Sequence, residues 1–111
     1  MRREVTLRRL VMTLMRRRGY KRVKKPDPDL GLDDRCLLYE KDGEQVLVVV
    51  LDWRRAVGYN VLLKYEAIVR ENGLSGLLVV APSFSYEAKR YAKRYGIQIL
   101  DRGALLDEVG W

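Results

Sequence analysis

An uninterrupted apolar run over residues 46–51 is the feature that most constrains how this chain can fold. A short run of this kind, rich in β-branched residues and free of charge, is typical of a strand buried on both faces in the middle of a sheet. A second apolar stretch lies at residues 37–39, and Asp42-Gly43 separates the two. Asp-Gly between apolar runs indicates a hairpin, because both turn positions favour positive φ. The sequence therefore predicts an antiparallel hairpin over residues 34–51.

The predicted hairpin brings charged residues together where its strands end. With a two-residue turn, Asp33 lies opposite Asp52, and directly opposite residues share a face with Cβ atoms roughly 5 Å apart. Arg54 follows on the same face and Trp53 points the other way, since side chains alternate along a strand. A three-residue turn would instead put Asp34 opposite Asp52. Two carboxylates and a guanidinium at the end of a buried hairpin are the first candidate site.

The rest of the chain alternates between helical and strand patterns. Helical spacing of apolar residues predicts three longer helices, and two further apolar runs and a short basic segment read as strands. The expected helices begin near residues 7, 57 and 84, with a short one at 103–108, and the expected strands lie at 20–25, 77–81 and 97–100. The order α-β-β-β-α-β-α-β joins a hairpin to strand–helix–strand units. We therefore expect one α/β domain over residues 1–111, a mixed central sheet in three layers.

The third helix is expected to pack through an apolar stripe of Phe84, Ala88, Tyr91 and Tyr95. Its other residues include two like-charge pairs at i, i+4 spacing, which cost a few tenths of a kcal/mol each in an isolated helix. Contacts with phosphates would offset that cost, whereas a solvated basic face is the alternative.

Composition narrows the chemistry that the domain can perform. The chain has no histidine and one cysteine, Cys36, which excludes Ser-His-Asp and Cys-His catalysis and metal sites built from those side chains. Any metal site must use carboxylate and carbonyl oxygens, which suit Mg²⁺ or Mn²⁺. A single buried thiol fits a reducing compartment, and neither a secretory signal nor an apolar span is apparent, so we expect a cytoplasmic protein without membrane contact. Abundant arginine and scarce Gln and Asn hint at a thermophilic source.

The net charge of +7 is unevenly distributed. Residues 1–25 carry eleven lysines and arginines and one acid, whereas residues 26–111 carry eleven basic residues and fourteen acids. A basic segment on a slightly acidic body indicates a polyanionic partner, although a solvated, arginine-rich surface is the alternative. The candidate phosphate-binding residues are Arg2, Arg9, Arg16, Arg55, Lys89, Arg90, Lys93 and Arg94.

Several motifs together resemble the PD-(D/E)xK nuclease superfamily. They are a helix ending in RRRGY, a GxD at residues 31–33, an apolar strand ending in DWR at 52–54, and VG at 57–58 opening a helix. Residues 76–106 are particularly similar to the Mrr-type restriction endonuclease domain. The resemblance implies a restriction-endonuclease-like fold and a DNA-binding, Mg²⁺- or Mn²⁺-dependent endonuclease with little sequence specificity.

The resemblance also implies roles for individual residues. The family's two metal-binding acids correspond to Asp33, with Asp34 as a near alternative, and to Asp52. The family's lysine corresponds to Arg54, which would stabilise the scissile phosphate. Arginine cannot be deprotonated, so Arg54 cannot act as a base. A glutamate on the first helix of Mrr-type enzymes falls about where Arg8 or Arg9 stands. A decayed site, whose acids merely end two strands, is the alternative.

A second resemblance points to a protein that does not cleave DNA. Residues 8–20 and 57–80 are similar to the amino-terminal jaw domain of the fifth subunit of eukaryotic RNA polymerases. That domain is a non-catalytic relative of the nuclease fold that lies near downstream DNA. It implies a transcription or DNA-scaffold protein, and either reading is compatible with a homodimer or a subunit of a larger nucleic-acid-processing complex.

Overall fold

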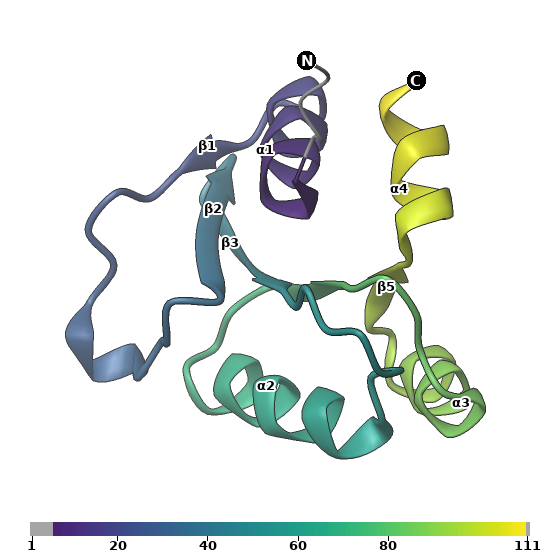
Figure 1. The fold of residues 1–111 in the computed structure, drawn as a ribbon. Coiled ribbons are helices and arrows are strands. Elements are labelled where there is room, and N and C mark those ends of the chain that lie inside the picture. Colours follow the sequence, from purple (N-terminus) through teal and green to yellow (C-terminus); the bar gives the residue numbers. More distant parts are fainter. Residues whose placement is uncertain (1–5, 111) are drawn as a thin grey trace.

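The computed structural model describes residues 6–110, which form a five-stranded sheet with helices on both faces (Figure 1). The order of elements is the predicted one, including the short final helix expected at residues 103–108, and a 3₁₀ turn is added before the hairpin. In chain order they are α1 (Leu7–Arg17), β1 (Lys21–Arg22), η1 (Pro28–Leu30), β2 (Cys36–Lys41), β3 (Glu44–Val50), α2 (Tyr59–Glu71), β4 (Gly76–Val80), α3 (Tyr86–Tyr95), β5 (Gln98–Leu100) and α4 (Arg102–Val109).

The sheet is mixed, as predicted, and its strands follow the order β1-β2-β3-β4-β5. Strands β1, β2 and β3 are antiparallel neighbours, whereas β3, β4 and β5 run parallel. The short edge strand expected within residues 20–25 is β1, only two residues long. None of the helices in residues 6–110 combines the length and the apolar character that a membrane span requires.

The hairpin of β2 and β3 has the predicted turn. Asp42 and Gly43 adopt φ values of 53° and 82°, the left-handed conformation that a two-residue hairpin turn requires. The register that this turn sets continues to Cys36, which pairs with Val49. Residues 34–35 then form a turn, so the paired ladder stops before it reaches the acids of the candidate site.

The core lies on both sides of β3. Val48 and Val50 pack with α1 and α4 on one face, while Leu47 and Val49 pack with α2 and α3 on the other (Figure 1). Val48 and Val49 are both fully buried. The apolar run is therefore the central, doubly covered strand that the sequence predicted, and the protein has three layers.

The packing of α3 differs from the predicted stripe. The helix buries Ala88 and Ala92 against the sheet, whereas Tyr91 is half-buried and Tyr95 is 52% exposed. Small alanine side chains let the helix lie close to the strands, and the bulky tyrosine rings are displaced to its flank. The predicted stripe is confirmed for Phe84 and Ala88, which are buried, and for Tyr91, which packs against the core while partly exposed. For Tyr95, which is mostly exposed, the prediction was wrong.

Candidate functional site at the end of β3

Asp33 lies in the turn that leads into β2, on the side of the sheet covered by α2. Its carboxylate accepts hydrogen bonds from the Tyr65 hydroxyl at 2.8 Å, the Arg35 amide at 3.0 Å and the Cys36 thiol at 3.4 Å. The Lys64 ammonium is 3.8 Å from the same carboxylate. Asp33 therefore ties the turn to α2, and both of its oxygens are engaged.

These contacts change the acidity of the groups involved. Partial burial alone would raise the pKa of Asp33, but the hydrogen bonds and the Lys64 ammonium outweigh it and lower the pKa below its ordinary value. Burial is the main cause, and the hydrogen bond to Asp33 the second, of a raised pKa in both Tyr65 and Cys36. The pKa of the Cys36 thiol rises to about 12. The phenol and the thiol therefore stay protonated near neutral pH, and Cys36 is unsuited to act as a nucleophile.

The low pKa of Asp33 makes a prediction about acid stability. Because the folded state favours the ionised carboxylate, Asp33→Asn should lower the free energy of unfolding at neutral pH by about 1.5–3 kcal/mol, the range for hydrogen bonds to a charged group. The deficit should shrink as pH falls below the ordinary aspartate pKa of about 4, where wild type loses this stabilisation too. Urea unfolding across pH measures both effects. The exposed neighbour provides the control: Asp34→Asn should change stability little, and a pH-independent deficit in Asp33→Asn would contradict the assignment.

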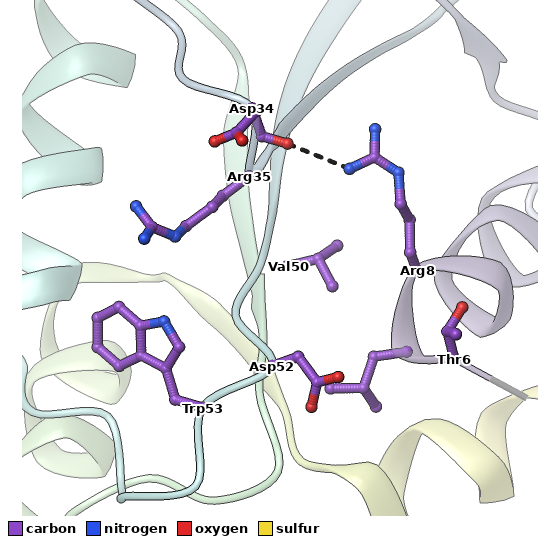
Figure 2. A pocket seen from close by; sticks show the side chains of 8 residues that line it. Thr6, Arg8, Asp34, Arg35, Val50, Asp52 and Trp53 are labelled. Carbon is purple, nitrogen blue, oxygen red and sulfur yellow. Dashed lines mark hydrogen bonds between the residues drawn. The ribbon is translucent and has the colours of Figure 1, made fainter. Parts of the chain in front are cut away.

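Asp52 lies on the α1 side of β3, in a surface pocket (Figure 2). Arg8, from the first turn of α1, reaches into this pocket and donates a hydrogen bond to the backbone carbonyl of Asp34 at 3.1 Å. Asp33 is not part of the lining. The lining residues are Thr6, Leu7, Arg8, Asp34, Arg35, Val50, Asp52 and Trp53.

The pairing of Asp33 with Asp52 predicted from the hairpin is therefore absent, although the turn itself is correct. The strand ladder ends at Cys36, and the turn at residues 34–35 breaks the alternation that would have carried Asp33 to the face of Asp52. Asp34 reaches the pocket instead. In Figure 2, Asp34 and Asp52 lie at opposite ends of the pocket and their carboxylates do not point toward each other.

Arg54 is also displaced from its predicted position. The chain bends at residues 54–55, and Arg54 lines a second hollow together with Arg35, Trp53 and Arg55. Trp53 packs against the core on the α2 side, as predicted, and two guanidinium groups lie near its ring. The Cζ atoms of Arg35 and Arg55 are 5.8 and 5.2 Å from the ring centroid, within cation–π range.

The described acids do not fit a divalent metal site of the predicted kind. In residues 6–110, no three carboxylate, thiol or imidazole groups come together in a way that could hold a metal ion. Asp34 and Asp52 offer the oxygen chemistry that Mg²⁺ prefers, but the guanidinium groups of Arg8 and Arg35 line the same pocket. Two cations offset the charge of two carboxylates there, which weakens the attraction for a further cation.

The predicted phosphate-binding residues fall into separate groups. Arg9 and Arg16 are exposed on α1, while the basic residues of α3 are exposed on the opposite side of the sheet, so the two sets do not form one continuous surface. The exposed basic residues of α3 are Lys89, Arg90, Lys93 and Arg94. Arg2 lies outside the described residues.

The structure adds two residues that sequence reasoning did not assign to the site. Arg35 lines both hollows, and Arg8 lines the pocket of Asp52. The position of Arg8 on the first helix, where the related enzymes carry a glutamate, was a signal that this side chain faces the site. Arg35 directly follows two aspartates at the start of the hairpin, which was the only sequence signal for it.

Comparison with known proteins identifies relatives of the fold. The sequence model of the Mrr_cat family, described as restriction endonuclease, matches residues 3–109. The crystal structure of a protein of unknown function, AF1548, has a TM-score of 0.65 and 19% identity, covering 91% of this chain and 64% of that one. EndoMS in its apo form has a TM-score of 0.56 and 19% identity, covering 90% of this chain and 47% of that one. No curated protein gives a match.

These findings agree with the architecture described above. The chain spans less than two thirds of either solved structure, and at this identity the likeness is one of fold alone. The mixed sheet, its order and its helical layers confirm the predicted restriction-endonuclease-like α/β fold. Because the family model covers nearly the whole sequence, the chain belongs to the Mrr_cat restriction endonuclease family.

Proposed function

We propose that the domain binds duplex DNA at the edge of the sheet where β3 ends, through an arginine cluster made of Arg8, Arg35, Arg54 and Arg55. One observation carries the proposal: Arg35, Arg54 and Arg55 line a single hollow around Trp53 without an acidic side chain in the lining. Guanidinium groups that line one hollow repel one another, and phosphate groups would relieve that repulsion.

The arginine cluster is available to a ligand. Neither Arg54 nor Arg55 forms an ion pair with another residue of the described chain, and both are exposed. Arg35 is only loosely paired, with 4.0 Å between its guanidinium and the Asp33 carboxylate. Arginine presents a planar fork of donors that matches the oxygens of a phosphate.

The location and the family both support DNA as the partner. Strands β3 and β4 run parallel, and open α/β sheets bind ligands outside the carboxyl ends of such strands. The family is described as restriction endonuclease, a class that acts on DNA. Backbone contacts made by arginine carry little sequence information, so we expect little sequence specificity.

Hydrolysis of DNA is the second candidate function. Asp34 and Asp52 line one pocket beside the arginine cluster, which favours it. Against it, Asp33 is held by Tyr65, and Arg54 lies outside the pocket. We infer that the described domain holds DNA without cleaving it, as the resemblance to the polymerase jaw implies.

The binding proposal predicts a steep salt dependence that relies on two arginines. In fluorescence anisotropy with a labelled duplex, Arg54→Glu/Arg55→Glu should weaken binding by more than about tenfold and reduce the salt slope by about two, because two phosphate contacts are lost. The matched control is Lys24→Glu/Lys25→Glu, an equal change of charge at exposed residues before η1, which should weaken binding far less. Equal losses in the two variants would contradict the proposed site.

A further inference from the structure

A row of tyrosines lies between α2 and α3, away from the arginine cluster. It consists of Tyr59, Tyr91 and Tyr95, here called the tyrosine ridge. The ring centroids of Tyr59 and Tyr91 are 6.2 Å apart, and those of Tyr91 and Tyr95 are 4.5 Å apart, with interplanar angles of 37° and 38°. Tyr59 is 47% exposed and Tyr95 52% exposed, so both side chains are accessible from solvent. Large aromatic side chains gathered at a surface indicate an interaction site.

The hollow of the tyrosine ridge carries more basic than acidic side chains. Arg90 and Arg94 line the same hollow as the three tyrosines, and Glu87 is the acid in that lining. The Cζ atom of Arg94 lies 5.6 Å from the ring centroid of Tyr95. Lys89 and Lys93 are exposed on the same helix, and none of the four basic residues forms an ion pair with another residue of the described chain.

This combination of rings and cations selects among possible partners. A second copy of the chain would bring the same four positive charges against themselves, which disfavours self-association through this face. Bases of a duplex stack on one another and do not present their faces to a protein. Unpaired bases do, and aromatic side chains beside basic residues are the common platform for them.

We propose that the tyrosine ridge binds single-stranded DNA, with unpaired bases stacking on Tyr59, Tyr91 and Tyr95 and phosphates contacting Arg90 and Arg94. The assignment of DNA rests on the proposed function. The ridge begins close in sequence to the arginine cluster, because Tyr59 starts α2 four residues after Arg55.

The test compares labelled oligo-dT with a labelled duplex of equal length. Tyr59→Ala/Tyr95→Ala should weaken oligo-dT binding by about tenfold or more, because each substitution removes a ring on which a base stacks and so lowers the affinity. Duplex binding should change less than about twofold, since phosphate contacts at the arginine cluster are untouched. Tyr59→Phe/Tyr95→Phe should retain oligo-dT binding, because phenylalanine keeps the stacking face. Leu63→Ala is the control, since Leu63 is also 47% exposed on α2 and should have no effect.

Each outcome separates the two proposals. Unchanged oligo-dT binding in the alanine variant, with duplex binding still dependent on Arg54 and Arg55, would overturn the ridge and leave the proposed function standing. Duplex binding that is unchanged in Arg54→Glu/Arg55→Glu would instead overturn the proposed function. Tyrosine-dependent preference for oligo-rU would overturn the assignment to DNA. Dimerisation that disappears in the alanine variant, without any effect on oligo-dT, would assign the ridge to a second copy of the chain.

Discussion

Asp34→Asn/Asp52→Asn should bind duplex DNA more tightly than the wild type, by about threefold to tenfold at low salt. Both acids line the pocket beside the arginine cluster, where their charge repels phosphates that the cluster attracts. Two unit charges about 4 Å apart interact by about 1 kcal/mol in water, and screening reduces the effect as salt rises. The amide substitutions remove the charge at nearly constant shape. Anisotropy in the presence of a chelator measures the change without any contribution from metal ions.

The same variant decides between holding and cleaving DNA. We expect supercoiled plasmid to stay intact with wild-type protein in Mg²⁺ or Mn²⁺, and Arg54→Lys to leave that result unchanged, because Arg54 lies outside the pocket of the acids. In a working nuclease, lysine at this position would restore a residue that can act as a base. Nicking by the wild type that disappears in Asp34→Asn/Asp52→Asn would contradict the non-cleaving assignment and establish the second candidate function.

The hairpin was predictable because its determinants are local. Asp42 and Gly43 fix the turn, the turn fixes the register, and the register places Cys36 opposite Val49 without reference to the rest of the chain. The doubly buried run of β3 was equally predictable, since a short, uncharged β-branched segment bounded by turn signals is typical of a central strand.

The candidate site was predicted less well, because the alternation of side chains holds only while a strand continues. The turn at residues 34–35 and the bend at residues 54–55 each end that alternation. Tyr65, distant in the sequence, holds the carboxylate of Asp33 on the α2 side. The predicted register put Arg54 on the face of Asp52, and it did not bring Arg8 or Arg35 into the site. The arginine cluster could therefore not be derived from the hairpin alone.

The arrangement of the basic residues on α1 and α3 could also be predicted only in part. The charge pattern of the sequence predicted phosphate-binding residues on two helices, Arg9 and Arg16 on one and the lysines and arginines of α3 on the other. Each of these residues is exposed. Sequence alone could not show that α1 and α3 cover opposite faces of the sheet. Which basic residues act together depends on this topology, and the tyrosine ridge, which joins the start of α2 to α3, depends on it too.

Stability should depend strongly on the face of α2 that meets the sheet. Leu62 is fully buried in the core on that side, next to strands β3 and β4, whereas its neighbour Leu63 is 47% exposed. Leu62→Ala removes buried methyl groups and leaves a cavity, so the free energy of unfolding should fall by about 2–5 kcal/mol. Leu63→Ala should change it by no more than about 0.5 kcal/mol. Urea unfolding of the two variants isolates the effect of burial, because the substitution is chemically identical.

The comparison also tests how the site is held in place. Tyr65 lies one helical turn after Leu62 and donates its hydroxyl to Asp33 at 2.8 Å. A helix loosened by Leu62→Ala should therefore hold the turn at residues 33–35 less firmly, and amide hydrogen exchange at Arg35 and Cys36 should become faster in Leu62→Ala than in Leu63→Ala. Equal exchange at these two amides in both variants would mean that β2, rather than α2, fixes the turn that carries Arg35 into the arginine cluster.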